Sequence, residues 1–288
     1  MLPGFSVNAG QISAREVKMP IPELREQTAI AEFLELKTDQ IDQAIIQKER
    51  QIELLHEHRQ ILIHKAVTRG LDPNVEMKDS GVDWIGNIPG HWQVLSNYAL
   101  FAERNEPGRD DLPILSVSIH TAVSSEEISD EENIRGKVRS EDKTTYKRVK
   151  PGDIAFNMMR AWQGAIGAVE IEGMVSPAYI VAKPKAAFDP RFLEFQFRTR
   201  DYIQQIDRFS KGIADFRKRL YWGEFKRLPT LLPPIEEQKQ ISDFICKLND
   251  KIETAISCKK KEIEKLNEYK AILINSAVTG KIRVCDSI

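Results

Sequence analysis

Few residues in this chain have the spacing that catalysis requires. The sequence contains neither a G-x-x-x-x-G-K-[ST] nor a G-x-G-x-x-G phosphate-binding loop, and Gly164 and Gly167 make only a lone G-x-x-G. His56, His58 and His64 lie close together in the sequence, but residues two apart do not share a helix face, and no H-E-x-x-H zinc motif is present. We interpret them as solvated helix histidines. The sequence therefore predicts no catalytic centre, no bound metal and no cofactor.

Basic residues are distributed unevenly along the chain, and this distribution indicates a binding surface and not a catalytic site. Between Trp92 and Thr230 there are 22 Lys and Arg against 20 Asp and Glu, a net charge of +2. Five of the acidic residues fall within 123–134, so the net charge of the rest of this region is +2 + 5 = +7. Two runs, 135–150 and 198–219, each carry seven basic residues, against two and three acidic ones. Segregated positive charge of this kind can face DNA phosphates. The alternative is a solvated surface of mixed charge.

Reading bases, as opposed to phosphates, needs Arg, Lys, Gln or Asn side chains that project into a groove of the duplex. Residue type and position along the chain lead us to expect ten DNA-binding residues: Lys143, Tyr146, Lys147, Arg148, Arg160, Gln163, Lys211, Arg217, Lys218 and Arg219.

The region that holds these residues has the pattern of a mixed α/β unit. Short apolar runs such as LPILSVSI, GDIAFNMM and SPAYIVAK, separated by turn residues, predict β-strands between Trp92 and Thr230. Residues 190–209 predict one helix among them. The segment before Trp92, from 71 to 91, is rich in Gly, Pro, Asp and Asn and is expected to be a connector.

An internal repeat flanks this region. PIPELREQTAIAEFL begins at Pro20 and LPPIEEQKQISDFI begins at Leu232, and Gln27 aligns with Gln238 at an offset of 238 − 27 = 211. The alignment continues without a gap to the tails ILIHKAVT and ILINSAVT.

Each copy of the repeat predicts a long amphipathic helix, over residues 24–67 and 235–278. Apolar residues recur every three or four positions, close to the 3.5-residue spacing of a coiled-coil seam, and each helix would be about 65 Å long. The simplest partner for each helix is the other copy. The residues expected to pack between helices are Ile30, Leu34, Ile41, Ile45, Ile52, Leu55, Ile241, Ile245, Leu248, Ile252, Leu266 and Leu273.

Two lysines interrupt this apolar seam at equivalent positions, since 48 + 211 = 259. Lys48 and Lys259 could fix the register of the helices at a cost in stability. Alternatively, each side chain could extend along the edge of the seam and keep its ammonium group in water.

The overall composition is that of a folded protein. At 288 residues the chain is long enough for two structural units, and its net charge of −1 argues against indiscriminate coating of nucleic acid. No apolar run reaches the ~18 residues of a membrane span, and no secretory signal is present. Three cysteines without a C-x-x-C favour a reduced compartment, so we expect the cytoplasm and no membrane partner.

Several motifs together resemble a known family. The repeated P-x-L/I-x-E-Q ahead of a long helix, the connector MKDSGVDWIGNIPGHWQV, and the segments VKPGDIAFNMMRAWQGAIGAV and GMVSPAYIVAKP resemble the specificity subunit of type I restriction-modification enzymes. The resemblance covers nearly the whole chain from Pro20. In that family two target-recognition domains alternate with two helical repeats, and each domain reads one half of a split DNA site.

The resemblance implies a fold, a function and partners. The fold class would be α+β, with one globular mixed α/β target-recognition domain flanked by two long α-helices that form an antiparallel coiled coil. The chain would bind double-stranded DNA without catalysing a reaction, reading one half of a split target, and its helices would dock the modification (methyltransferase) subunits and the restriction (endonuclease/translocase) subunit. The absence of N-P-P-Y and D-P-P-Y, which an adenine methyltransferase would use, agrees with a non-catalytic subunit.

The same resemblance divides the chain. We expect a remnant of a preceding recognition domain at 1–19, the first helical repeat at 20–70, the connector at 71–91, the recognition domain at 92–231, the second repeat at 232–281 and a tail at 282–288. Only one recognition domain is expected, which makes the chain a half-subunit. Two copies would then form a homodimer that prefers an inverted-repeat site.

Two other functions are consistent with the residues alone. A scaffold protein could use the globular domain to bind protein and the helices to support an assembly. A nuclease with an unrecognised active site is the third alternative.

Overall fold

The computed structural model describes residues 21–119, 122–124, 145–212 and 218–284. The chain forms two compact units, one from Met1–Leu54 with Ala255–Ile288 and one from Leu55–Thr254. Of the predicted DNA-binding residues, Lys143 and Arg217 lie outside the described residues. No helix in the described part of the chain combines the length and apolarity needed to cross a membrane.

The two long helices are confirmed. α1 spans Leu24–Arg69 and α6 spans Ile235–Val278, and neither contains Gly or Pro. α1 ends directly before Gly70 at φ 74°, and α6 ends two residues before Gly280 at φ 71°; at both glycines a residue with a Cβ would be strained.

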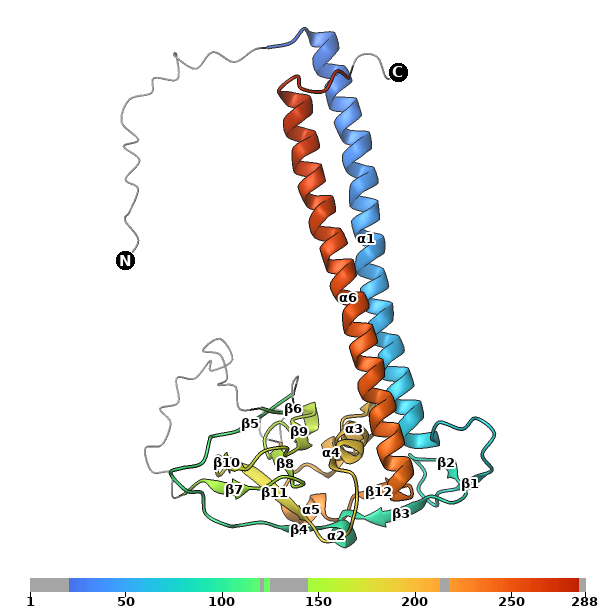
Figure 1. Ribbon diagram of the computed structural model, residues 1–288, viewed down its shortest axis with the longest axis vertical. Coiled ribbons are helices and arrows are strands. Elements are labelled where there is room, and N and C mark those ends of the chain that lie inside the picture. The colour runs from blue at the N-terminus through green and yellow to red at the C-terminus, as the bar shows by residue number, and fades with distance from the viewer. Residues whose placement is uncertain (1–20, 120–121, 125–144, 213–217, 285–288) are drawn as a thin grey trace. The chain divides into compact units, whose positions relative to one another are not determined.

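Within the first unit α1 and α6 pack antiparallel, as the fold class predicts (Figure 1). Asp42 accepts hydrogen bonds from Lys270 Nζ at 2.7 and 2.6 Å, while Lys48 pairs with Glu262 at 2.6 Å, so increasing numbers on α1 meet decreasing numbers on α6. Each of the twelve residues expected to pack between the helices is buried or partly buried.

The two seam lysines converge on one carboxylate. Glu262 lies 2.6 Å from Lys48 Nζ and 3.4 Å from Lys259 Nζ, and the two lysine side chains are 29% and 28% exposed. The hydrogen bond to Lys48 lowers the pKa of Glu262 and raises that of Lys48. Both ammonium groups therefore reach the edge of the seam, as the second alternative predicts.

The second unit contains the mixed α/β domain. Its main sheet has four antiparallel strands in the order β4 (Phe101–Glu103), β11 (Tyr179–Pro184), β8 (Ile154–Asn157) and β9 (Ile166–Ala168). The two-stranded pairs are β1 (Met77–Asp79) with β2 (Asn87–Pro89), β3 (Gln93–Ser96) with β12 (Pro229–Leu232), β5 (Ser116–Ser118) with β6 (Ala122–Ser124), and β7 (Lys147–Val149) with β10 (Gly173–Val175). The remaining helices are α2 (Asn97–Leu100), the 3₁₀ turn η2 (Ala161–Gln163), α3 (Pro190–Phe197), α4 (Arg200–Phe209) and α5 (Trp222–Phe225).

The prediction of a single helix over residues 190–209 is wrong, because the structure has two helices in this range. Thr199 separates α3 from α4 and caps α4, its Oγ1 accepting from Tyr202 N at 3.4 Å and donating to Gln196 O at 2.7 Å. A threonine side chain that bonds to the backbone in this way favours a helix start over a helix interior.

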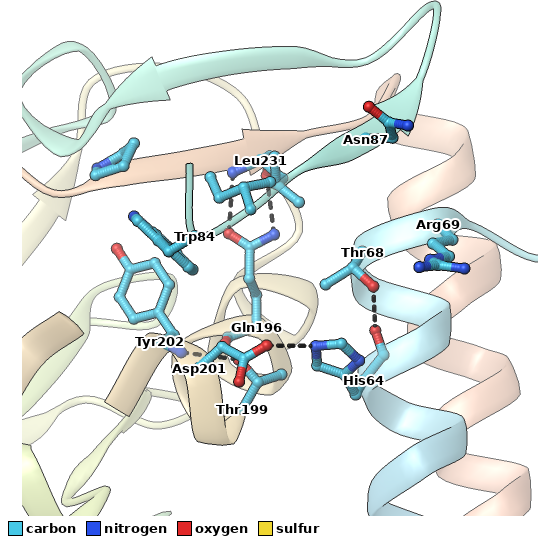
Figure 2. A pocket seen from close by; sticks show the side chains of 12 residues that line it. His64, Thr68, Arg69, Trp84, Asn87, Gln196, Thr199, Asp201, Tyr202 and Leu231 are labelled. Atoms are coloured by element: carbon cyan, nitrogen blue, oxygen red, sulfur yellow. Dashed lines mark hydrogen bonds and ion pairs between the residues drawn. The ribbon is translucent and has the colours of Figure 1, made fainter. Parts of the chain in front are cut away.

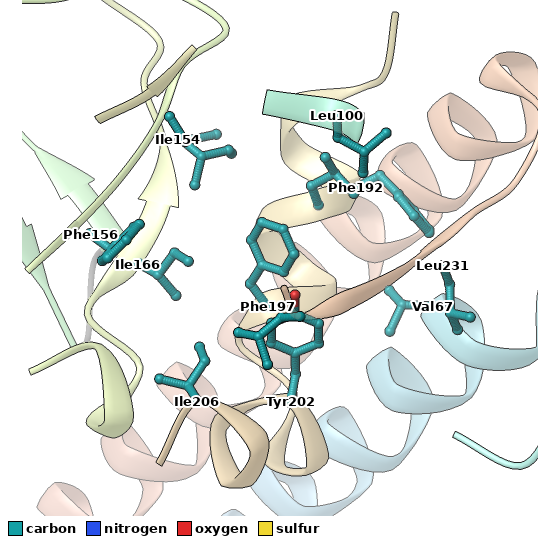
Figure 3. Packing of buried hydrophobic residues seen from close by; sticks show 14 of the residues in the cluster. Val67, Leu100, Ile154, Phe156, Ile166, Phe192, Phe197, Tyr202, Ile206 and Leu231 are labelled. Carbon is teal, nitrogen blue, oxygen red and sulfur yellow. The ribbon is translucent and has the colours of Figure 1, made fainter. Parts of the chain in front are cut away.

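One apolar core joins the recognition region to the ends of both long helices. Val67 of α1 is fully buried in the same cluster as Phe192 and Phe197 (Figure 3). Ile241 and Ile245 of α6 are also fully buried in this cluster. Burying a side chain of this size contributes about 1.5–3 kcal/mol. Ile241 and Ile245, which we predicted to pack between helices, therefore also hold the globular domain.

Candidate nucleic-acid interface

A small cavity near α4 has the residues of a binding pocket but not the space. His64, Trp84 and Tyr202 line it, and its volume is about 60 Å³, whereas ligand pockets measure several hundred (Figure 2). Its polar groups are used internally, since His64 Nε2 lies 2.9 Å from Asp201 Oδ2 and Gln196 bonds both backbone groups of Leu231. We therefore assign it to the packing of α1 against α4.

A polar network beside this cavity is likewise structural. The Tyr202 hydroxyl lies 3.0 Å from Thr230 Oγ1 and accepts from Asn97 Nδ2 at 3.1 Å. Burial raises the pKa of Tyr202, so the phenol stays protonated at neutral pH. No group of three or more His, Cys, Asp or Glu that could hold a metal occurs in the described residues.

The structure commits several of the predicted DNA-binding residues to contacts within the domain. Arg148 pairs with Glu172, Lys211 pairs with Glu224, and Lys218 pairs with Asp207 at 2.8 Å. Lys147 Nζ donates to the Tyr179 carbonyl at 2.8 Å. A cation engaged in these contacts must exchange partners before it binds a phosphate.

Tyr146 is placed differently from the prediction. Its side chain is buried, with 7% of the residue exposed, and its Cβ lies 3.2 Å from the position a Cβ would take on Gly108. Tyr146 therefore supports the packing of β7 and does not present its ring on a surface.

Three predicted residues remain exposed without a side-chain partner among the described residues: Arg160, Gln163 and Arg219. Arg160 precedes η2 and Gln163 ends it, and Gln163 N donates to Arg160 O at 2.9 Å. The 3₁₀ turn that follows strand β8 thus brings two free donor side chains within three residues of each other.

Helix α4 contributes further free donors that the prediction missed. Arg200, Gln204 and Arg208 are exposed, and their spacing of four places them on one face of the helix. None has a side-chain partner among the described residues. The spacing is visible in RTRDYIQQIDRF, but the prediction did not use it.

A groove connects the turn to the helices. It has a volume of about 570 Å³ and is lined by Arg59, Gln60, Ile63, Ile119, Gln163, Gly164, Glu194, Phe195, Arg198, Arg200, Ile203 and Asn249. Arg59 is paired with Glu253 and Arg198 donates to the Ile119 carbonyl at 2.8 Å, which leaves Arg200 as the exposed cation of the groove.

Glu194 is the carboxylate that lines the groove. Burial raises the pKa of Glu194, whose Oε2 accepts from Ala168 N at 2.7 Å. Burial also lowers the pKa of Arg198. The hydrogen bond from Ala168 N and the charge of Arg198 oppose the shift in the pKa of Glu194, because both favour its carboxylate form.

We compared the chain with known proteins. No family model matches it. It is 27% identical to the specificity subunit of the type I restriction enzyme MjaVIII of Methanocaldococcus jannaschii, over 93% of this chain, and 28% identical to that of EcoBI of Escherichia coli, over 82%. The resemblance to type I specificity subunits is confirmed. The chain spans 63% and 53% of the lengths of these two specificity subunits.

Solved structures support the fold of a specificity subunit. A chain from a structure on complex assembly and conformational transition of the type I R-M system has a TM-score of 0.63 at 13% identity, covering 92% of this chain and 62% of that one. The HsdS subunit from Thermoanaerobacter tengcongensis has a TM-score of 0.51 at 12% identity, covering 92% and 61%. The predicted fold class, a mixed domain with two long helices, is confirmed.

Proposed function

We propose that this specificity subunit binds DNA through the free donors around η2 and α4, and that it reads one half of a split target. The observation that carries the proposal is a set of exposed side chains with no side-chain partner among the described residues, in a chain similar to specificity subunits: Arg160, Gln163, Arg200, Gln204 and Arg208. Arg and Gln are the residue types that bind purine edges, and the same arginines can contact phosphates.

The chain would be the non-catalytic part of a cytoplasmic assembly. Modification subunits would supply methyl transfer and a restriction subunit would supply translocation and cleavage, both docked through the long helices. The recognition domain of this proposal is the predicted segment 92–231, and the predicted repeats 20–70 and 232–281 are its supports.

We further propose that the helix ends around Gln27 and Val278 receive a second recognition domain from a second copy of the chain. Gln27, Ile30 and Leu34 repeat the residues Gln238, Ile241 and Ile245, and the latter three are buried against the recognition domain. Gln27 is exposed, and Ile30 and Leu34 are only partly buried. Two identical domains would favour an inverted repeat.

Binding selection from randomised duplex DNA, with and without a modification subunit, tests these proposals. An inverted, split motif is the expected result. A single uninterrupted half-site would keep the DNA interface but contradict the pairing of two copies. No enrichment in either condition would favour the scaffold alternative.

The salt dependence of binding provides a second check on the interface. Binding through phosphate contacts should weaken steeply as salt rises, with the slope set by the number of phosphates neutralised. Arg200→Ala and Arg208→Ala should each reduce that slope by about one. A salt-independent affinity would contradict a DNA interface built on these arginines.

A further inference from the structure

The turn η2 carries two side chains whose chemistry suits base recognition. Arg160 has a fork of donors that matches O6 and N7 of guanine, and the Gln163 amide can donate to N7 and accept from the N6 amine of adenine. Both are exposed, and neither has a side-chain partner among the described residues. By contrast, Lys211 and Lys218 are held by carboxylates.

The spacing of the two residues matches neighbouring base pairs. The hydrogen bond from Gln163 N to Arg160 O closes a turn of four residues, which keeps their Cα atoms within about 7 Å. Base pairs are spaced about 3.4 Å along the helix axis. The two side chains can therefore reach base pairs that are adjacent or separated by one.

Hydrogen bonds within the turn and close packing against α4 hold the conformation of η2. Trp162 Nε1 donates to Met159 O at 2.9 Å, and Met159 N donates to Asn157 Oδ1 at 2.9 Å. Gly164 closes the turn at φ 98°, where a Cβ would lie 3.2 Å from Ile203 of α4. These contacts fix the backbone between Arg160 and Gln163 before DNA binds.

Trp162 also anchors the turn through its ring. The ring packs against the main apolar core, and Lys218 Nζ lies 5.6 Å from the ring centroid while it pairs with Asp207 of α4 at 2.8 Å. A cation over an aromatic face at this distance is attracted by the ring. Trp162 and Lys218 thereby tie the turn to α4.

From these contacts we infer that Arg160 and Gln163 are the specificity-determining pair of the recognition domain, which read a guanine and an adenine in the major groove at most two base steps apart. Trp162 and Lys218 are positioning residues that hold the turn. The inference rests on the proposed DNA-binding function.

Binding selection on single variants of the full chain, with the modification subunit present, tests the assignment. Arg160→Ala should lower the preference for guanine at one position by about tenfold to a hundredfold, and Gln163→Ala should do the same for adenine at one neighbouring position. Gln163→Glu should change that second preference from adenine to cytosine, because a carboxylate accepts from the cytosine N4 amine. A change of preference cannot arise from misfolding.

Three further variants separate base reading from positioning and from charge. Trp162→Ala should weaken discrimination at both positions together, and Trp162→Phe, which keeps the ring but loses the bond to Met159, should restore part of it. Arg208→Ala should lower affinity for all sequences without changing the motif.

The outcomes distinguish this inference from the proposed function. A wild-type motif that survives unchanged in both Arg160→Ala and Gln163→Ala would overturn the specificity assignment and leave DNA recognition standing. A wild-type chain that selects no motif would overturn both.

Discussion

Gln27 and Gln238 occupy the same position in the two copies of the repeat, and their local contacts are the same. Each donates from Nε2 to a proline carbonyl five residues earlier, Pro22 or Pro233, at 2.7 Å. Their surroundings differ, because Gln238 is 1% exposed and its Oε1 accepts from Asp189 N at 2.8 Å. The Oε1 of Gln27 has no partner among the described residues. The same local sequence therefore makes the same helix start, and the docked domain alone decides burial.

The other helix ends show the same contrast. Val67 at the end of α1 is fully buried, whereas its equivalent at the end of α6, Val278, is 63% exposed. Glu237 at the start of α6 accepts from Trp92 Nε1 at 3.1 Å and lies 2.7 Å from His91 Nε2. The globular domain packs on the helix ends that contain Val67 and Glu237. At the opposite helix ends, no domain among the described residues packs on the equivalent positions.

Between the ends, the repeat encodes its own pairing. Asp42 pairs with Lys270 in the first unit and Arg59 pairs with Glu253 in the second. Because 42 + 211 = 253 and 59 + 211 = 270, exchanging the two copies converts one ion pair into the other. An antiparallel arrangement of two similar helices thus satisfies both pairs with one sequence pattern.

The largest difference between the two sets of helix ends is expected for valine substitutions. Val67→Asp should lower the free energy of unfolding by about 3 kcal/mol or more, because it buries an unpaired charge in the core. At protein concentrations low enough for the chain to be monomeric, Val278→Asp should change it by less than about 0.5 kcal/mol, because the site is exposed in the single chain. Urea denaturation measures both effects. Similar values for the two variants would contradict the assignment of one docked and one open end.

Sedimentation equilibrium of Val278→Asp tests whether two copies of the chain pair through the open helix ends. If the open end receives a second copy of the chain, the variant should dissociate into monomers at concentrations at which the wild type is dimeric. A wild-type chain that stays monomeric alone and in complex with the modification subunit would contradict the homodimer.

The two glutamines should differ by a smaller amount. Gln238→Ala removes the acceptor for the buried Asp189 amide and should cost about 1–3 kcal/mol of unfolding free energy. Gln27→Ala, the matched control, loses only an exposed bond and should cost less than about 0.5 kcal/mol. Thermal or urea denaturation tests this, and an equal loss in both variants would show that the proline contact alone matters.

Substitutions in the ion pairs between α1 and α6 should have the smallest effect on the free energy of unfolding. They test whether these pairs help to set the register of the two helices. Asp42→Lys should destabilise the helix pair by about 0.5–1 kcal/mol, because the pair with Lys270 is partly exposed to solvent. Combining it with Lys270→Asp should recover most of the loss. A double-mutant cycle measures the coupling, and a coupling of zero would remove this pair from the determinants of register.

The candidate interface was predictable only in part, for a physical reason. Residue type marked Arg160 and Gln163 as candidates, and the structure leaves both exposed. Lys147 and Lys218 have the same charge but are engaged by the Tyr179 carbonyl and by Asp207 of the preceding helix α4, which lie 32 and 11 residues away in the sequence. Charge along a chain does not reveal which cations fold onto carboxylates or carbonyls.

The sequence alone determined the two long helices, because uninterrupted periodicity and the glycines that follow are local properties of 44 and 46 residues. It also determined that the copies resemble each other closely enough to pair. The break of the helix at Thr199 is local as well, because this residue bonds to backbone groups three positions away. Only the tertiary structure decided that Tyr146 turns inward. It also decided which copy of the repeated residues is buried. Those outcomes depend on which apolar surfaces meet. The identical side chains of Gln27 and Gln238 lie in different environments, because a domain packs on Gln238 and not on Gln27.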